Sequence, residues 1–421
     1  GAARYLRAGV VGQGHGLSRP QLADPHHHRR QLQLAATLPL VVFVDPCPRS
    51  LLAASTRSFQ QAQWNRVLIL VELNGGNDGL NTLIPYGDER YYQMRPRLAI
   101  PRERVLQLSE QIGLHDALEP LMPLWQQREL AWVQGVGYAE PNRSHFRSIE
   151  IWETASDSRQ ILDEGWIARL FEINPPPSTF AADGIVLGRR DAGPLSGKTI
   201  RTIALEDPQQ FLAQASRVPS LTQASSNPAL AHILQVQREL THAAVDFAQR
   251  LEQSPPLHAT FPPSPIGRQL QTAAQLLAAK VPVAVIKVSI GSFDTHANQL
   301  GHHERLLKEL AEAVVAFRQA MQQSGHWDRL LMMTYSEFGR RVGENASSGT
   351  DHGTAAPHFF LGGNVKGGLY GAAPSLMDLA EGDLRHHIDY RSLYRTVITN
   401  WWGLSGTISR MSDYPVIDCL A

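Results

Sequence analysis

Long apolar runs alternate along most of this chain with amphipathic stretches. The run that begins at Val67 shows no alternation of polar and apolar positions, which is typical of a strand covered on both faces. The pattern predicts strands near 67–73, 130–135, 281–290, 330–335 and 359–361, and helices near 116–128, 145–155, 303–323 and 390–402. Strands that alternate with helices predict parallel βαβ units. We therefore expect an α/β fold with a mostly parallel central sheet flanked by helices.

Two proline-rich segments interrupt this alternation in the middle of the chain. Their sequences are EINPPPSTFAADG and EQSPPLHATFPPSPIG, and a long helix is predicted between them at 228–253. We expect residues 156–265 to form a helical or irregular insertion on the main α/β domain. That domain is expected to span 65–403, and a C-terminal tail follows at 404–421.

The N-terminal region has the pattern of an export signal. Arg29 and Arg30 precede an apolar stretch at 34–44, and small residues follow around Ala54. This order predicts a removable twin-arginine signal over 1–54, and hence a periplasmic or secreted protein that uses the twin-arginine export machinery. The apolar stretch is shorter than the roughly 20 residues of a membrane-spanning helix, so we expect no permanent membrane anchor. The alternative is an ordinary buried helix behind a basic cap.

Charge and cysteine content narrow the classes of partner. The chain of 421 residues has 39 Lys plus Arg and 39 Asp plus Glu. Because no basic excess favours nucleic acid or an anionic membrane, we expect no nucleic-acid partner and a small-molecule substrate instead. The only cysteines in the sequence are Cys47 and Cys419, which excludes a disulfide framework and a cysteine-rich zinc site.

Polar residues that can do chemistry follow several predicted strands. Gly75 and Gly76 follow the first strand and allow a sharp turn, after which Asp78 lies beyond the carboxyl end of that strand. Ligands usually bind at this edge of an open α/β sheet, so Asp78 is a candidate functional residue. The alternative is a turn in which Asn77 and Asp78 bond to nearby backbone amides.

Ser144 is a candidate of a different kind. It stands at the start of the helix predicted at 145–155, where free backbone amides favour an anion. The alternative is that Ser144 only caps the helix, a role that needs no further function.

A group of candidate metal ligands follows the strand at 281–290. Asp294 and His296 are two positions apart, which places them on one face of an extended chain. His302 and His303 follow at the start of the next helix. An aspartate with three nearby histidines predicts a metal site.

A further group follows the strand at 330–335. Glu337 comes almost directly after the strand, and Asp351 and His352 lie in a glycine-rich turn. Taken singly, Glu337 could pair with Arg340 or its neighbour, and Asp351 could cap a turn. Carboxylates and imidazoles without thiolates together predict one or two divalent metal ions, zinc or manganese. Two ions about 4 Å apart would hold the attacking and leaving oxygens of a phosphate-like ester.

Five motifs occur in a fixed order along the chain: LNGGNDGLNTLIPY, PNRSHF, FDTHANQ, YSEFGRR, and GTDHGTAAP with LGGNVKGGLYG. In this order they resemble the exported bacterial family called domain of unknown function 1501, over nearly all of 65–403. That family is similar to the alkaline phosphatase and sulfatase superfamily, and a twin-arginine signal is typical of it. The resemblance implies an alkaline-phosphatase-like fold and a metal-dependent hydrolase of a phosphate or sulfate ester.

The resemblance also implies roles for the candidate residues. It makes Ser144 the nucleophile. The metal ligands that it implies are Asp78 for one ion, Asp294 with His296 or His302 for the other, and Glu337 and His352 to complete the set. Candidates to contact the substrate anion are Asn142, Arg143 and Lys366, of which Arg143 could equally be solvated.

The chain departs from the superfamily pattern in two places. Phe338 stands where a histidine ligand is expected, and the spacing from Asp294 to His296 is shorter than usual. Neither cysteine lies in the Cys-x-Pro-x-Arg motif of formylglycine sulfatases, which excludes that chemistry. The main alternative to an ester hydrolase is a non-catalytic binding or assembly protein that keeps the fold. Nucleotide binding by GGNDG is disfavoured, because neither the GxGxxG nor the GxxxxGKS/T loop is present.

Overall fold

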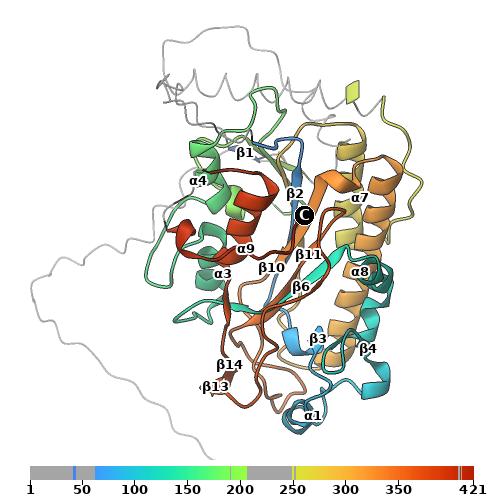
Figure 1. The fold of residues 1–421 in the computed structure, drawn as a ribbon, viewed down its shortest axis with the longest axis vertical. Helices are drawn as coiled ribbons and strands as arrows, with labels where there is room; N and C mark the ends of the chain where they lie inside the picture. The colour runs from blue at the N-terminus through green and yellow to red at the C-terminus, as the bar shows by residue number, and fades with distance from the viewer. Residues whose placement is uncertain are drawn as a thin grey trace, which may run out of the picture. The chain divides into compact units, whose positions relative to one another are not determined.

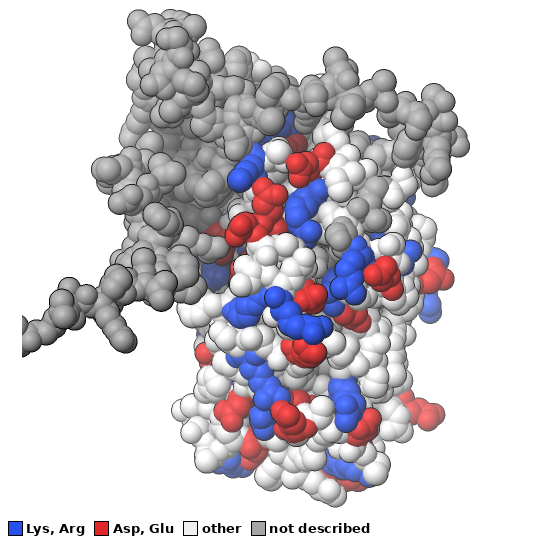
Figure 2. Space-filling model, turned by 90° about the vertical axis from the view of Figure 1, so that its left-hand side faces the viewer, with Lys and Arg blue, Asp and Glu red and all other residues white. Residues whose placement is uncertain are grey.

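A computed structural model describes residues 41–43, 62–189, 191–205, 249–250, 253–405, 408 and 410–421. Within these residues the largest element is a ten-stranded, mostly parallel sheet that lies between two sets of helices (Figure 1). The predicted α/β class is therefore confirmed. On the face shown in Figure 2, acidic and basic side chains of the described residues are interspersed, so charge is balanced locally as well as overall.

The strand order across the large sheet is β1, β8, β7, β9, β2, β10, β11, β6 and β12, and β15 also pairs with β6. The bounds are β1 Val41–Phe43, β2 Val67–Leu73, β6 Leu130–Gly137, β7 Gly184–Leu187, β8 Thr202–Leu205, β9 Val285–Ile290, β10 Leu330–Tyr335, β11 Ala356–Leu361, β12 Gly368–Tyr370 and β15 Ile388–Asp389. Strands β8, β7, β9, β2 and β10 run parallel, whereas β11 is antiparallel to both β10 and β6. The carboxyl ends of β9, β2 and β10 therefore share one edge of the sheet, which we call the carboxyl edge.

The helices on the two faces of the sheet bury separate apolar clusters. Helices α7 and α8 cover one face, and α3, α4 and α9 cover the other (Figure 1). Their bounds are α3 His145–Thr154, α4 Trp166–Ile173, α7 Pro265–Ala278, α8 Gln299–Gln323 and α9 Arg391–Thr396.

Strand β2 shows how its sequence produces this layering. Ile69 and Val71 pack in the cluster with α7 and α8, whereas Leu68 and Leu70 pack in the cluster on the opposite face. All four side chains are fully buried. Each such burial stabilises the fold by roughly 1.5–3 kcal/mol, which explains an apolar run without alternation. The prediction of a strand covered on both faces is confirmed.

Shorter elements surround the sheet. They are α1 Glu89–Met94, α2 Met122–Gln126, the small strands β3 Leu83–Ile84, β4 Leu106–Gln107, β5 Gly113–Leu114, β13 Leu379–Ala380 and β14 Asp383–Leu384, the 3-10 helices η2 Gly79–Asn81, η3 Arg102–Arg104, η4 Asp116–Leu121, η5 Gly193–Leu195, η6 Trp327–Arg329 and η8 Met411–Asp413, and the π-helix η7 Val397–Trp401. The helix predicted at 116–128 is thus a 3-10 segment that contains Pro120, followed by α2. The strand predicted from 281 begins only at Val285.

The described part of the predicted insertion at 156–265 differs from the expectation. It contains α4, β7 and β8, and β7 pairs with both β8 and β9, so this part extends the main sheet. Its strands are only four residues long, and they join the sheet because β7 pairs with distant β9 and β8 pairs with β7. Most of the helix predicted at 228–253 lies outside the described residues.

The predicted export signal at 1–54 lies outside the described residues except for β1. The backbone of β1 pairs antiparallel with β8. In the described part of the chain, no helix has both the length and the apolar character needed to cross a membrane. At the other end, Leu420 bridges to Val365 and Cys419 is buried, so the predicted tail at 404–421 packs against the α/β domain.

Candidate metal centre

A cluster of ligand-type side chains lies at the carboxyl edge of the sheet. His145 is the first residue of α3 and follows β6, Asp294 lies in the loop after β9, and His352 lies between β10 and β11. One ligand atom from each of these residues lies within 4.8 Å of the others. Three separate strand ends therefore supply one candidate metal site.

His296 joins the same point. Its Nε2 atom is 3.0 Å from Asp294 Oδ1 and 3.0 Å from His352 Nε2. His352 Nε2 is 3.2 Å from Asp294 Oδ1, and His145 Nε2 is 3.4 Å from Asp294 Oδ2. We call these four residues the metal-ligand cluster.

The opposite ring nitrogen of each histidine faces an acceptor. His145 Nδ1 is 2.8 Å from Glu337 Oε1, and His352 Nδ1 is 2.8 Å from the backbone carbonyl of Arg143. His296 Nδ1 lies 3.4 Å from Asp351 Oδ1. Such acceptors place the proton on Nδ1 and leave the lone pair on Nε2, which is the usual arrangement around a metal-bound histidine.

In these tautomers the Nε2 lone pairs of the cluster point toward one another, which is unfavourable without a cation between them. The Nε2 lone pairs of His296 and His352 would meet at 3.0 Å, and the buried Nε2 of His145 has no hydrogen-bond partner within the described structure. Facing lone pairs repel unless a proton or a metal ion lies between them. Three imidazole nitrogens and one carboxylate are also a common donor set for zinc. The residues therefore fit a divalent metal ion.

The pKa shifts in the cluster favour metal-binding protonation states at two residues and oppose them at one. Burial raises the pKa of Asp294, but the hydrogen bond and charge of Arg340, together with His352 and His296, outweigh it and the net pKa falls to about 2. Burial lowers the pKa of His352. The hydrogen bond to Glu337 raises the pKa of His145. At neutral pH, Asp294 is thus ionised and His352 neutral, while protons compete for His145.

Arg340 holds the loops that carry the cluster. Its buried guanidinium donates to the carbonyls of Gly76 at 2.7 Å, Thr350 at 2.9 Å and Phe293 at 3.0 Å, and to Asp294 Oδ1 at 2.7 Å. The sequence had suggested Glu337 as its partner. A side chain at Gly75, where φ is +116°, would bring a Cβ to 2.4 Å from the amide nitrogen of Asp294. The glycines after β2 therefore allow the Asp294 loop to approach, as well as making the turn.

Asp78 lies outside the metal-ligand cluster. It is fully buried, its Oδ1 accepts from the amide of Leu80 at 3.2 Å, and its Oδ2 accepts from Arg95 at 2.6 Å and from Gln299. Burial opposes its charge, but the attraction of Arg95 leaves a net lowered pKa. Asp78 thus caps η2 and forms a buried ion pair, so the structure does not bring it to the other predicted ligands.

Ser144 lies beside the cluster, at the N-cap of α3. Its side chain is exposed and makes no capping hydrogen bond, so its hydroxyl is not used for the role that the sequence left as an alternative. Its backbone amide donates to Asn142 Oδ1 at 2.8 Å. Next to it, the Arg143 guanidinium pairs with Asp383. Asn142 and Arg143 thus shape the turn that presents Ser144 and His145.

The remaining predicted site residues divide into two groups. Glu337 is buried, accepts from the amide of Gly75 at 2.8 Å and orients His145, so it supports a ligand. His302 Nε2 bonds to the carbonyl of Ser292 at 2.8 Å, apart from the cluster. Lys366 pairs with Asp418 at 2.6 Å beside the start of β6, whereas the cluster follows the end of β6. The structure therefore does not bring His302 or Lys366 to the site.

His145 was not among the predicted ligands. It is the residue after Ser144 in PNRSHF, and it stands at the junction of a buried strand and a helix. Asp294 and Glu337 were predicted as ligands because they follow a buried strand, and the same reasoning applied to His145 would have identified it. Phe338, which stands where a histidine was expected, packs its ring 4.9 Å from His145 and 4.5 Å from His352.

Comparison with solved structures finds distant similarities. The chain is 11% identical to the lipoteichoic acid synthase LtaP from Listeria monocytogenes, with a TM-score of 0.32 over 73% of this chain and 66% of that one. It is 9% identical to a protein in the alkaline phosphatase superfamily from Vibrio parahaemolyticus, with a TM-score of 0.39 over 85% and 71%. It is 10% identical to the PsFucS1 sulfatase from Pseudoalteromonas sp., with a TM-score of 0.40 over 85% of this chain and 72% of that one. This chain thus spans about two thirds of the length of LtaP.

Comparison with curated proteins finds no match. A family model described as "Protein of unknown function (DUF1501)" matches residues 131–411, which is more than half of the chain. The matched range contains all four residues of the metal-ligand cluster, together with Ser144 and Glu337. The chain therefore belongs to the DUF1501 family.

Proposed function

We propose that the protein is an exported, metal-dependent hydrolase of a phosphate or sulfate ester. One observation carries the proposal: three histidines turn their Nε2 atoms toward Asp294 while an acceptor faces each Nδ1. A polar cluster that only stabilised the fold would be expected to pair these nitrogens with hydrogen-bond donors of the protein. The sequence supports export through the twin-arginine pattern at Arg29 and Arg30.

Charge at the site supports a divalent ion. Asp294, Glu337 and Asp351 bring three carboxylates, and Arg340 brings one guanidinium, so two negative charges remain when the histidines are neutral. One zinc or manganese ion would neutralise them. With imidazole donors in the majority, we propose zinc as the better fit.

The chain's own residues supply the other parts of an ester hydrolysis. A metal ion held by the cluster would withdraw electron density from the ester and offset the charge that develops on it. Ser144, with a free hydroxyl next to His145, is the proposed nucleophile. The free amides of the first turn of α3 would favour the anionic group. Asn142 fixes the backbone of Ser144, and Arg143 is proposed to contact the substrate anion from a side chain that is 32% exposed.

The test combines metal analysis with hydrolysis assays on the full chain. The protein should contain about one zinc or manganese ion per chain by elemental analysis and should hydrolyse p-nitrophenyl phosphate or p-nitrophenyl sulfate. Ser144→Ala should keep the metal and lose roughly 100-fold or more of kcat. Ser178→Ala, at an exposed serine elsewhere, is the matched control. A protein that binds no metal, or a fully active Ser144→Ala variant, would refute the proposal.

A binding or assembly protein is the second candidate, and two observations favour it. Asp78 is committed to Arg95 and Phe338 fills the place of a ligand, so the described residues assemble one metal cluster and not two. Stoichiometric metal together with no hydrolysis of either class of ester would support this candidate.

A further inference from the structure

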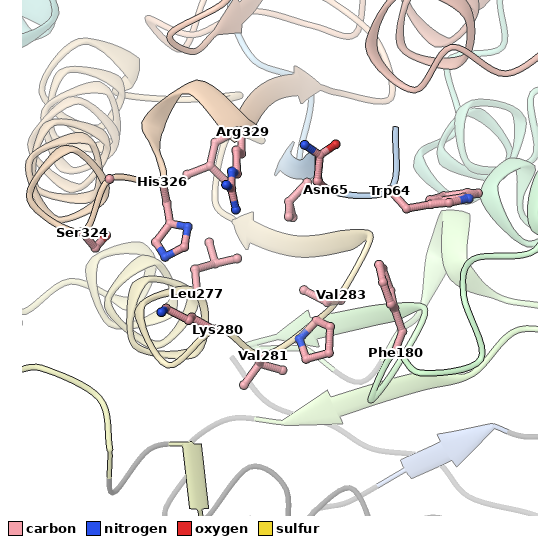
Figure 3. A pocket seen from close by; sticks show the side chains of 14 residues that line it. Trp64, Asn65, Phe180, Leu277, Lys280, Val281, Val283, Ser324, His326 and Arg329 are labelled. Carbon is pink, nitrogen blue, oxygen red and sulfur yellow. The ribbon is translucent and has the colours of Figure 1, made fainter. Parts of the chain in front are cut away.

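A cavity of about 700 Å³ opens at the other end of the strands (Figure 3). Val67 at the start of β2, Leu330 at the start of β10 and Val283 just before β9 line it. We call it the amino-edge cavity. Seven residues of β2 separate it from the carboxyl edge, which at about 3.3 Å per residue is a span of roughly 20 Å. A ligand in this cavity could not touch the metal-ligand cluster.

The walls of the amino-edge cavity are mainly apolar and aromatic. In Figure 3, Trp64 and Phe180 stand together on one side, and Val281 and Val283 lie near them. Trp64 is held in place by edge contact with Phe171 at 5.5 Å, so this wall is preformed. A volume of this size and a preformed apolar wall are typical of sites for small organic molecules.

The opposite side of the cavity carries basic side chains, two of them permanently charged. Lys280, His326 and Arg329 lie there in Figure 3. Among the described residues no carboxylate forms an ion pair with Lys280 or Arg329, although the chain has many such pairs elsewhere. The neighbouring Asp328 directs its carboxylate at Gly363 instead. Burial, and then repulsion by Arg329 and Lys280, lowers the pKa of His326, which reflects how closely the three groups approach.

Helix dipoles do not account for all of this positive charge. Helices α7 and α8 end at Ala278 and Gln323, just before Lys280 and His326, and cations are favoured at helix C-termini. Each terminus carries about −0.5 of a charge, so two termini offset about one of the two permanent positive charges. One positive charge therefore remains beside an apolar cavity.

We propose that the amino-edge cavity binds an organic anion with an apolar body, its acidic head at Lys280 and Arg329 and its body against Trp64 and Phe180. Lys280 and Arg329 are exposed, so a neutral apolar molecule would gain nothing from their charge, and a small inorganic anion would leave the aromatic wall exposed to water. The match of charge on one side and apolar surface on the other selects an amphipathic anion, such as a carboxylate or phosphate with a hydrocarbon or aromatic body.

The test uses two twelve-carbon probes of opposite charge, below their micellar concentrations. Laurate and dodecylammonium are titrated into the full chain by isothermal titration calorimetry. Laurate should bind with one site per chain, and dodecylammonium should bind at least tenfold more weakly. Lys280→Gln and Arg329→Gln should each weaken laurate binding about tenfold, which is the scale of one charge-assisted hydrogen bond. Lys308→Gln, at an exposed lysine on α8, should leave it unchanged.

Further variants separate this site from the rest of the molecule. The double variant Lys280→Glu/Arg329→Glu should bind dodecylammonium in preference to laurate, a gain that unfolding could not produce. His352→Ala should bind laurate as the parent does, so a failure of the proposed hydrolase activity would leave this result standing. Equal binding of both probes, no laurate binding, or laurate binding unaffected by Lys280→Gln and Arg329→Gln would overturn the proposal.

Discussion

At the carboxyl edge of the sheet the histidine nitrogens Nδ1 face fixed acceptors, whereas at the amino edge Lys280 and Arg329 have no described ion-pair partner. The carboxyl edge is built from the segments that follow β2, β6, β9 and β10, and those after β6, β9 and β10 bring the ligand-type side chains together. The amino edge is built from the ends of α7 and α8, which pack against apolar strand starts and leave a cavity. One edge thus gathers ligand-type side chains at a single point, and the other sets basic side chains apart from an apolar wall across a cavity. A large cavity in a fold need not mark its chemistry.

The largest expected effect comes from removing a ligand at the preorganised edge. His352→Ala should lower metal affinity by more than about 100-fold, because it removes a donor rather than a supporting residue, whose loss alone costs 10- to 100-fold. Metal titration followed by calorimetry measures this. His302→Ala changes a histidine outside the cluster and should bind metal as the parent does. If both variants and the parent bound metal with equal affinity, His352 would not be a metal ligand and the carboxyl edge would not differ from the amino edge in this respect.

Asp78→Asn should act on stability and leave metal binding intact. The change strands the Arg95 charge in the interior, and breaking a buried ion pair from one side costs about 3–5 kcal/mol. Urea denaturation measures the free energy of unfolding. The control is Asp116→Asn, whose ion pair with Arg104 is partly exposed and should cost less than about 1 kcal/mol. Loss of metal from a stably folded Asp78→Asn protein would restore Asp78 as a ligand.

Glu337→Gln should have an intermediate effect on the metal site. The amide oxygen would still accept a hydrogen bond from His145 Nδ1. Without the buried negative charge, however, the Nε2 atom of His145 would be a weaker electron-pair donor to a metal ion. We expect metal affinity to fall roughly 10- to 100-fold while the fold is retained. A competition assay with a chelator of known affinity would show it. An unchanged affinity would mean that Glu337 only fixes the turn through Gly75.

The smallest effect expected is a difference in pH response between the edges. The raised pKa of His145 means that a proton occupies its ring at a higher pH than usual, and metal must displace that proton. Metal affinity should therefore fall, by about tenfold, as pH decreases from 8 to 6. Asp294, with a pKa of about 2, stays ionised throughout. Lysine and arginine do not titrate in this range, and the lowered pKa of His326 keeps its ring mostly neutral, so laurate affinity should change less than twofold. If metal affinity and laurate affinity changed with pH to the same extent, the proposed difference between the two edges would be wrong.

Sequence alone predicted the fold where local pattern and burial agree. The run at Val67–Leu73 is apolar because both faces of β2 are covered. The run at Leu330–Tyr335 is apolar for the same reason, since both faces of β10 are covered. Strands β7 and β8 were assigned to an insertion, because four-residue strands between proline-rich segments carry little local signal. Strand β7 is placed by pairing with β9, which lies about 100 residues away in the chain, and β8 is placed by pairing with β7.

The site was only partly predictable for a similar reason. Asp294, His296 and His352 were identified because ligand types gather after buried strands. Asp78 has the same local pattern, and what distinguishes it is the ion pair with Arg95, 17 positions further along the chain. The amino-edge cavity left no trace in the sequence, because it arises where helix ends and strand starts from distant segments fail to fill the space between them.

The guanidinium of Arg340 has a consequence for the order of events during folding. It bonds to the carbonyl of Gly75, 265 positions away, while the backbone carbonyl of Arg143 meets His352 across 209 positions. Contacts between residues this far apart form late, because the chain must lose the conformational entropy of a long loop before the contacts can stabilise it. Strands β2 and β10 also pair across loops of this length, so we expect the metal-ligand cluster to form with the sheet or after it, which leaves metal no role as a folding nucleus. An ion that bound only to the finished cluster would slow unfolding without speeding folding.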